Sequence, residues 1–229
     1  MGKVRFQGYM VAGLIALVMI QGKGAASAAV LTLYTQGTPN TLGSTGFSGP
    51  EYPQYIAGKF TLSQASQVQS LTWDGSYFNN DIDNFGFVSA TTDNFSIYLF
   101  QDSGNTVGSL IGGAVFTGSA TSRVVSPNPN LYNYAATITP TSLAAGNYWV
   151  GISNDASGFD VRWGWNASNN DLGFTDRLSL SSPTSGYSLT SNNVLVFSVL
   201  GAVPEPSAVT GLLAASGTLC LVRFRRSKA

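Results

Sequence analysis

The chain has 229 residues, of which 44% are hydrophobic and only 10% are charged. Its formal charge of zero conceals an acidic middle, because residues 29–203 carry four basic and ten acidic side chains, a net charge of −6. So few cations cannot neutralise many phosphates, and we expect no nucleic-acid partner. The chain has no histidine, and its single cysteine, Cys220, lies near the C-terminus. Ser-His-Asp and Cys-His catalysis and zinc sites built on these residues are therefore excluded from the middle region.

The start of the chain has the three parts of a secretory signal peptide. Lys3 and Arg5 form a basic region, residues 9–20 are apolar, and small residues follow. Ala26 and Ala28 fit the A-x-A cleavage pattern, so we expect signal peptidase to cut after Ala28, with a cut one residue later as the alternative. A retained membrane helix is the other interpretation, and the short apolar stretch argues against it.

The exported domain, residues 29–200, is predicted to consist of short strands. A first strand is expected near residues 31–34. The other predicted strands, rich in β-branched and aromatic residues and several of them alternating, are 55–62, 68–73, 95–100, 114–117, 133–139, 147–153, 159–165 and 194–200. Because no window between them has a helical period, we predict an all-β fold, an antiparallel β-sandwich of jelly-roll type.

Turn residues separate the predicted strands. Turns are expected at Asp74-Gly75 and at residues 102–105, 126–129 and 145–147. Segments 35–53 and 178–193, rich in small and hydroxylated residues, are expected to be loops.

Without histidine or cysteine, the exported domain has only carboxylate side chains to offer for acid–base or nucleophilic catalysis of the glycosidase type. A glycosidase needs two carboxyl groups across a cleft, but Glu51 is the only glutamate of the exported domain and its aspartates lie in turn-like sequence. We therefore expect no enzymatic activity, with a carboxylate glycosidase as the rival hypothesis.

A cluster of acidic and amide residues between residues 74 and 93 is a candidate calcium site. Its carboxylates are Asp74, Asp81, Asp83 and Asp93. Calcium takes six to eight oxygen ligands, which such a segment can supply, although the spacing does not match an EF-hand loop. The competing interpretation is that these are solvated turn residues. A structural calcium ion is the one cofactor that the sequence suggests.

Aromatic residues form a candidate carbohydrate-binding surface. Trp163 and Trp165 are two residues apart in a predicted strand and so share one face. With Tyr148 they could offer flat rings to a sugar. Burial in the core is the alternative, and it is favoured because β-sandwiches pack around their tryptophans.

The C-terminus joins three features in a fixed order. Residues 201–206 form a linker ending in Pro204, Glu205 and Pro206, residues 207–222 are uncharged and mostly apolar, and residues 223–229 are basic. A helix over 207–222 would measure about 24 Å, slightly less than the hydrocarbon core of a bilayer, so we predict a transmembrane helix. The basic tail would then lie in the cytoplasm, with the rest of the chain outside.

This arrangement resembles the PEP-CTERM sorting signal of Gram-negative bacteria. The matching residues are Pro204, Glu205 and Pro206 as the motif, and Arg223, Arg225 and Arg226 as the basic stop. The resemblance implies a precursor anchored in the inner membrane, recognised by an exosortase and then sorted to the cell surface or to an exopolysaccharide matrix. An ordinary membrane anchor is the alternative.

The exported domain loosely resembles the jelly-roll modules found in proteins with this tail, in segments 71–77, 95–100 and 143–150. We expect a non-enzymatic structural or adhesive protein of the cell surface or biofilm matrix. The alternative is a carbohydrate-binding, lectin-like module that is assisted by calcium and has polysaccharide as its partner.

Overall fold

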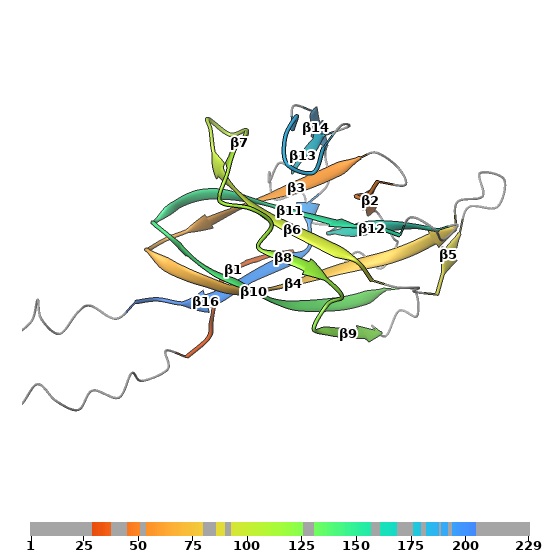
Figure 1. Ribbon diagram of the computed structural model, residues 1–229, viewed down its shortest axis with the longest axis horizontal. Coiled ribbons are helices and arrows are strands. Elements are labelled where there is room, and N and C mark those ends of the chain that lie inside the picture. The colour runs from red at the N-terminus through yellow and green to blue at the C-terminus, as the bar shows by residue number, and fades with distance from the viewer. Residues whose placement is uncertain are drawn as a thin grey trace, which may run out of the picture.

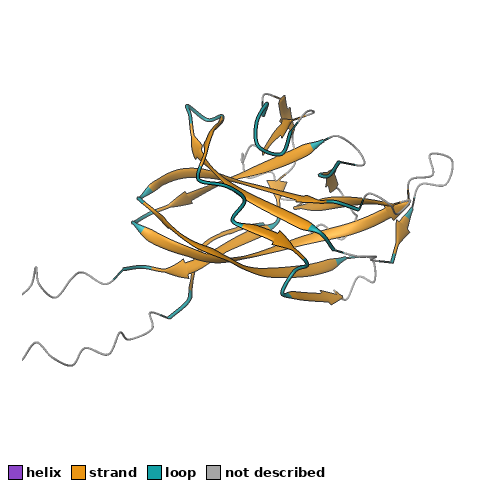
Figure 2. Ribbon diagram, in the orientation of Figure 1, coloured by secondary structure: helices purple, strands orange, loops and turns teal. Residues whose placement is uncertain are grey.

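The structure is a computed structural model, and it describes residues 29–37, 45–50, 54–79, 86–89, 93–125, 131–156, 161–168, 176–179, 182–187, 189–191 and 194–204. All regular structure within these residues is β-strand (Figure 2), and every strand pair is antiparallel. The predicted all-β antiparallel class is therefore confirmed. The predicted signal peptide, membrane span and basic tail lie outside the described residues. Within the described part of the chain, no helix suited to crossing a membrane was found.

The strands form two sheets that stack face to face (Figure 1). The nine-stranded sheet contains β1 (Leu31–Gln36), β2 (Thr45–Phe47), β4 (Ser66–Asn79), β5 (Phe87–Val88), β9 (Ser122–Val125), β10 (Tyr132–Leu143), β12 (Val161–Ser168), β15 (Val194–Leu195) and β16 (Phe197–Ala202). The seven-stranded sheet contains β3 (Tyr55–Leu62), β6 (Phe95–Asp102), β7 (Val107–Leu110), β8 (Phe116–Gly118), β11 (Gly146–Asn154), β13 (Asp176–Ser179) and β14 (Leu189–Ser191).

The 14-residue strand β4 is the centre of the nine-stranded sheet. On one side it pairs with β10, and on the other its first part pairs with β16 and its last part with β12. The main path of the sheet is β1-β16-β4-β10-β9. In the other sheet the order is β14-β13-β3-β11-β6-β7. Strands far apart in sequence are thus neighbours, so every face of the sandwich combines distant parts of the chain.

The core between the sheets is built around aromatic rings. The ring of Phe95 on β6 lies 5.0 Å from that of Trp73, 4.9 Å from that of Tyr134 and 5.2 Å from that of Trp163, measured between centres. All four residues are buried. Edge-to-face contacts of this kind add to the burial of large apolar surfaces. Truncating such a ring to alanine typically costs about 3–5 kcal/mol.

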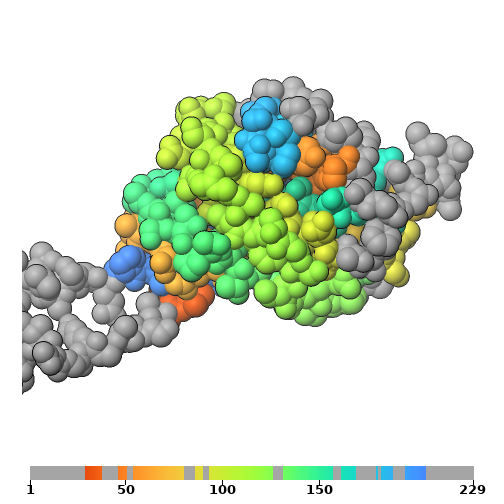
Figure 3. All heavy atoms as spheres, viewed as in Figure 1, coloured from red at the N-terminus to blue at the C-terminus, as the bar shows by residue number. Residues whose placement is uncertain are grey.

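A second, smaller apolar cluster lies on the outer face of the seven-stranded sheet. It consists of Ala57, Phe100, Trp149 and Tyr187, all buried. Tyr187 belongs to the segment 182–187, which packs there beside β7. In the space-filling view the blue segment containing Tyr187 and the yellow-green hairpin of β7 lie next to each other (Figure 3). This sheet is therefore covered in part on both faces.

The predicted turn at Asp74-Gly75 is wrong. Both residues lie inside β4, where Asp74 pairs with Asn133 and Gly75 with Tyr132. Glycine is needed there for another reason, since a Cβ atom on Gly75 would lie 2.5 Å from Nε1 of Trp163. The glycine therefore marks a close approach of a ring to the backbone, which sequence alone does not distinguish from a turn.

The predicted turn over residues 102–105 is confirmed as the β6–β7 hairpin connection. Gly104 and Asn105 have φ angles of 61° and 68°, and the backbone N–H of Asn105 donates to Oδ2 of Asp102 at 3.3 Å. Glycine and asparagine are the residues that tolerate this left-handed conformation.

Three segment predictions need correction. The expected loop 35–53 contains the end of β1 and all of β2, and the expected loop 178–193 contains the end of β13 and all of β14. The single strand expected at 194–200 is divided into β15 and β16 at Val196. These short strands are held by neighbours distant in sequence, so their local composition does not reveal them.

Candidate functional site

A groove of about 360 Å³ lies on the outer face of the nine-stranded sheet, across β16, β4, β10 and β9. Alternation along these strands produces this face. Trp73, Tyr134 and Phe197 point into the core, so the side chains beside them in sequence point outward. The residues that line the groove are Gly37, Thr72, Trp73, Asp74, Ser122, Val124, Asn133, Tyr134, Ala135, Val196, Phe197 and Ser198.

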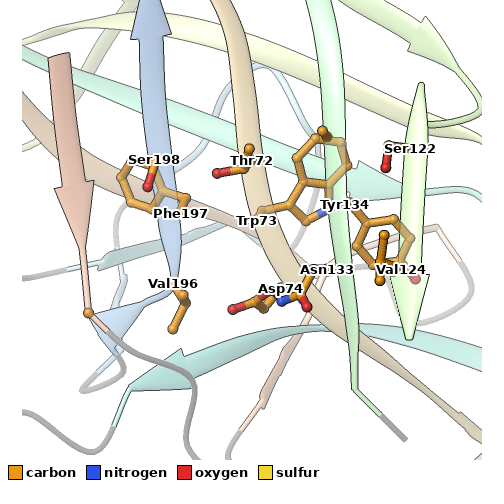
Figure 4. Close-up of a pocket in the computed structure, with 12 residues that line it drawn as sticks. Thr72, Trp73, Asp74, Ser122, Val124, Asn133, Tyr134, Val196, Phe197 and Ser198 are labelled. Carbon is orange, nitrogen blue, oxygen red and sulfur yellow. Dashed lines mark hydrogen bonds between the residues drawn. The ribbon is translucent and has the colours of Figure 1, made fainter. Parts of the chain in front are cut away.

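One row of outward side chains crosses the groove through Asp74, the only carboxyl group among the described residues that line it. Asn133 on β10 is paired with Asp74 on β4 and with Val124 on β9. On the other side of β4, the backbone N–H of Asp74 donates to the carbonyl oxygen of Val196 at 3.4 Å. Figure 4 shows the resulting order, with Asp74 and Asn133 side by side between Val196 and Val124. Two polar groups thus lie between two branched apolar ones.

The neighbouring row is rich in hydroxyl groups. Ser198 pairs with Thr72, Thr72 with Ala135, and Ala135 with Ser122 (Figure 4). The row continues onto β1, because Oγ1 of Thr35 lies 2.8 Å from Oγ of Ser198 in a hydrogen bond. Hydroxyl groups both donate and accept hydrogen bonds, so this row is not biased towards either sign of charge.

The carboxyl group of Asp74 is buried, with 6% of the residue exposed. Nδ2 of Asn133 donates to its Oδ1 atom, and among the described residues no hydrogen bond is made to Oδ2. Burial raises the pKa of Asp74 to about 6, and the hydrogen bond from Asn133 opposes this rise. The carboxylate is ionised at neutral pH, although incompletely solvated.

The division between β15 and β16 shapes the end of the groove. At Val196 the backbone N–H donates to the carbonyl oxygen of Asn166 at 2.9 Å, on β12. The carbonyl oxygen of Val196 accepts from Nε1 of Trp165 at 3.0 Å and from the N–H of Asp74. The chain thus changes from pairing with β12 to pairing with β4 at this residue. This change places the Val196 side chain beside Asp74 in the lining of the groove (Figure 4).

The predicted aromatic platform is not formed. Trp163 and Trp165 are buried, with 1% and 0% exposed, so the core alternative is the correct one. Tyr148 lies in the other sheet, where its ring is 5.7 Å from that of Phe60 and its hydroxyl group donates to the carbonyl oxygen of Ala144 at 3.1 Å. Alternation predicted the shared face of the two tryptophans correctly, but it could not show that the second sheet covers that face.

The described carboxylates of the predicted calcium cluster have different partners. Asp74 binds its neighbour on β10, whereas Asp93 accepts from the hydroxyl group of Tyr77 at 2.6 Å and from an arginine of β9 at 3.1 Å. Asp81 and Asp83 lie outside the described residues. Within the described residues, no group of three or more acidic, histidine or cysteine side chains is arranged to hold a metal ion.

The sorting and cleavage motifs are almost entirely beyond the described part of the chain. Pro204 is its last residue. Glu205, Pro206, Arg223, Arg225, Arg226, Ala26 and Ala28 all fall outside it.

Sequence reasoning found Asp74 but missed the rest of the groove. Thr72, Asn133 and Ser198 each lie in a predicted strand, next to a residue that points into the core, so alternation alone places them outward. What the sequence lacks is the order of the strands. Only the adjacency of β16, β4, β10 and β9 brings these side chains together.

No model of a known protein family matches the sequence, and a search of curated proteins finds no matching chain.

Proposed function

We propose that this chain is an exported protein that serves a structural or adhesive role at the cell surface or in the exopolysaccharide matrix of a Gram-negative bacterium. Signal peptidase and an exosortase would process it, and the C-terminal helix would hold the precursor in the inner membrane until then. The terminal sequence patterns support this proposal. For the topology of the sandwich we propose the jelly-roll type, on the loose resemblance of its strand segments.

One observation of the fold carries the proposal. β1 and β16 are paired, with Leu31 opposite Gly201, so the described chain begins and ends at the same end of the sandwich (Figure 1). Signals at both termini would therefore attach to one end of the domain. The opposite end and the outer face of the nine-stranded sheet would stay accessible while the precursor is anchored.

The intact mass of the protein recovered from its own host tests this proposal. Cell-surface and medium fractions should both be measured. We expect a chain that begins near Ala29 and ends near Pro206. A recovered mass that includes residues 207–229 would instead indicate a permanent single-pass anchor, and one that includes the first 28 residues would contradict export by signal peptidase.

We further propose that the protein is not an enzyme. Of the lining residues that the structure describes, Asp74 is the only one with a carboxyl group. Hydrolysis of glycosides usually needs two, one as the acid and one as the base or nucleophile. We expect no hydrolysis of any glycan by the purified protein. Hydrolysis that a single aspartate substitution abolishes would establish the rival glycosidase hypothesis.

A second candidate function is carbohydrate binding, and the groove is the observation that favours it. Its two tryptophan candidates are buried, so the binding surface must be placed elsewhere. The rows around Asp74 combine hydroxyl, amide and carboxyl groups with valine side chains. Small-molecule sites in general combine apolar surface with a small number of precisely placed polar groups.

A further inference from the structure

We propose that the groove across β16, β4, β10 and β9 binds a residue of a neutral glycan, with Asp74 and Asn133 hydrogen-bonded to sugar hydroxyl groups and Val124 and Val196 against the C–H face of the ring. This inference rests on the adhesive function proposed above. It replaces the aromatic platform with a site in a different part of the nine-stranded sheet.

The free oxygen of Asp74 is the first reason. A buried carboxylate needs hydrogen-bond donors, and only Oδ1 receives one, from Asn133, among the described residues. Oδ2 remains for a donor from the groove. Sugar hydroxyl groups are such donors, and a hydrogen bond to an ionised acceptor is stronger than one between neutral groups. Two hydroxyl groups on adjacent ring carbons could be bound together, one by Asp74 and one by the Asn133 amide.

The shape and the apolar rim are the second reason. A volume of about 360 Å³ is at the lower end of ligand pockets, which suits one or two small rings rather than a large cofactor. Val124 and Val196 stand on either side of the polar pair (Figure 4). A sugar ring has an apolar C–H face as well as hydroxyl groups, so it can contact both kinds of surface at once.

The charge of the groove selects against anionic ligands. Among the described residues that line it, none is a lysine or an arginine. The nearest cation on these strands, Arg123 of β9, turns instead to Asp93 at 3.1 Å and lies over the ring of Tyr132 at 5.6 Å. Uronate, sulfate or phosphate groups would face the carboxylate of Asp74 without compensation. A neutral hexose polymer meets no such cost.

Two neighbouring valines that are about equally exposed allow a controlled test of the groove. Val124 and Val125 of β9 are 59% and 57% exposed, but only Val124 lines the groove. Val124→Lys should place a long side chain over the polar pair, while Val125→Lys adds the same charge outside the groove. Neither substitution removes core packing. The full chain, purified in a neutral detergent, would be run in native gels containing dextran, mannan or galactan, with alginate as the anionic comparison.

We expect at least one neutral polysaccharide to retard the wild type and Val125→Lys, and alginate not to. Val124→Lys should lower the apparent affinity for that polysaccharide, measured from the retardation at several polysaccharide concentrations, by about tenfold or more. Asp74→Asn should weaken it similarly by removing the charged acceptor, whereas Asp155→Asn, an exposed carboxyl group that does not line the groove, should not.

The pH dependence of glycan binding gives an independent test of the site. Binding should weaken as the pH falls from 8 to 5, because protonation of Asp74, whose pKa is about 6, removes an acceptor. The only other titratable group in the described part of the lining is Tyr134, whose pKa burial raises above its usual value, so it stays neutral throughout. In Asp74→Asn any remaining binding should not change over this range.

The outcomes separate the inference from the function on which it rests. Retardation that Val124→Lys and Asp74→Asn leave unchanged would overturn the site, while glycan adhesion would stand. No retardation by any neutral polysaccharide, together with recovery of the protein from the host's matrix, would overturn glycan binding and leave a structural role. Retardation by alginate alone would overturn the selection for neutral ligands.

Discussion

Asp74 is held in an environment that disfavours its charged form, and this has a consequence for stability. Its pKa is about 6 in the folded protein against 3.8 for the unperturbed group. Between these two values the folded state keeps a proton that the unfolded state has lost. The contribution of Asp74 to stability therefore falls as the pH rises from about 4 to 6.

Asp74→Asn should remove this dependence, because asparagine is neutral at every pH and can still accept from Asn133. At pH 4 the variant and the wild type should have similar stability. At pH 7 the variant should be more stable by up to about 3 kcal/mol, at about 1.4 kcal/mol for each pKa unit. Urea unfolding at both pH values measures the difference.

The matched substitution is Asp155→Asn, which changes an exposed carboxyl group. It controls for the loss of one negative charge without removing a buried carboxyl group. If the free energies of unfolding of Asp74→Asn and the wild type differed by the same amount at pH 4 and pH 7, the pKa of Asp74 would not be raised in the folded protein.

Gly75 carries a packing constraint that can be tested in isolation. A Cβ atom there would meet the indole of Trp163 at 2.5 Å, whereas one at Gly113 would find no atom within 4 Å. Gly75→Ala should destabilise the protein by about 1–3 kcal/mol through overpacking. Gly113→Ala should be neutral or slightly stabilising, because it restricts only the unfolded chain. Equal urea midpoints for the two variants would show that Trp163 moves aside without cost.

At the scale of elements, the segment 182–187 is held by the buried ring of Tyr187 and by the hydroxyl group of Ser179, which donates to the carbonyl oxygen of Ser185 and accepts from the backbone N–H of Ser182. Tyr187 is buried over Gly151, its ring lies 5.4 Å from that of Phe100, and its hydroxyl group donates to the carbonyl oxygen of Pro183 at 2.8 Å. Because Gly151 has no side chain, there is room for the ring. The outer cluster therefore helps to hold this segment against the seven-stranded sheet.

Tyr187→Ala should destabilise the protein by about 3 kcal/mol or more, through loss of a buried ring. Tyr187→Phe should cost only about 1 kcal/mol, the net value of one hydrogen bond. Hydrogen exchange read by mass spectrometry should show faster exchange in 182–187 for the alanine variant, while the core strand β6 changes little. Similar exchange in both variants would mean that other contacts hold the segment.

The elements themselves were predicted unevenly, and the reason is physical. β3 was predicted at its observed limits, because its residues alternate and turn residues flank it. β4 was predicted to end before Asp74 but continues to Asn79, since β10, β12 and β5 supply hydrogen-bond partners for residues with low strand propensity. Pairing across the sheet therefore overrides local preference.

For the whole molecule, the calcium hypothesis makes a prediction that does not depend on the groove. If residues 74–93 bind a structural calcium ion, the ion stabilises the folded state by mass action. A chelator should then lower the melting temperature of the protein by several degrees, and excess calcium should restore it. No change on adding the chelator would reject the ion and leave the alternative interpretation, in which no ion binds these residues.

The site was less predictable than the fold. The sequence singles out Asp74 as one carboxylate of a candidate calcium site, but its hydrogen-bond partner Asn133 is 59 positions away along the chain. Trp163 and Trp165 were correctly placed on a common face, and the favoured core interpretation was correct. No local signal, however, connects Val124, Val196 and Ser198 with Asp74.

The sequence by itself determined the all-β class, most strand positions, the acidic character of the domain and the exclusion of histidine and cysteine chemistry. These properties depend on composition and on alternation between neighbouring residues. Only the tertiary structure decided which faces are covered, which strands are adjacent and where the groove lies. The physical reason is that alternation divides each strand into two faces without fixing what packs on either. That choice depends on hydrogen bonds and ring contacts between residues far apart in the chain.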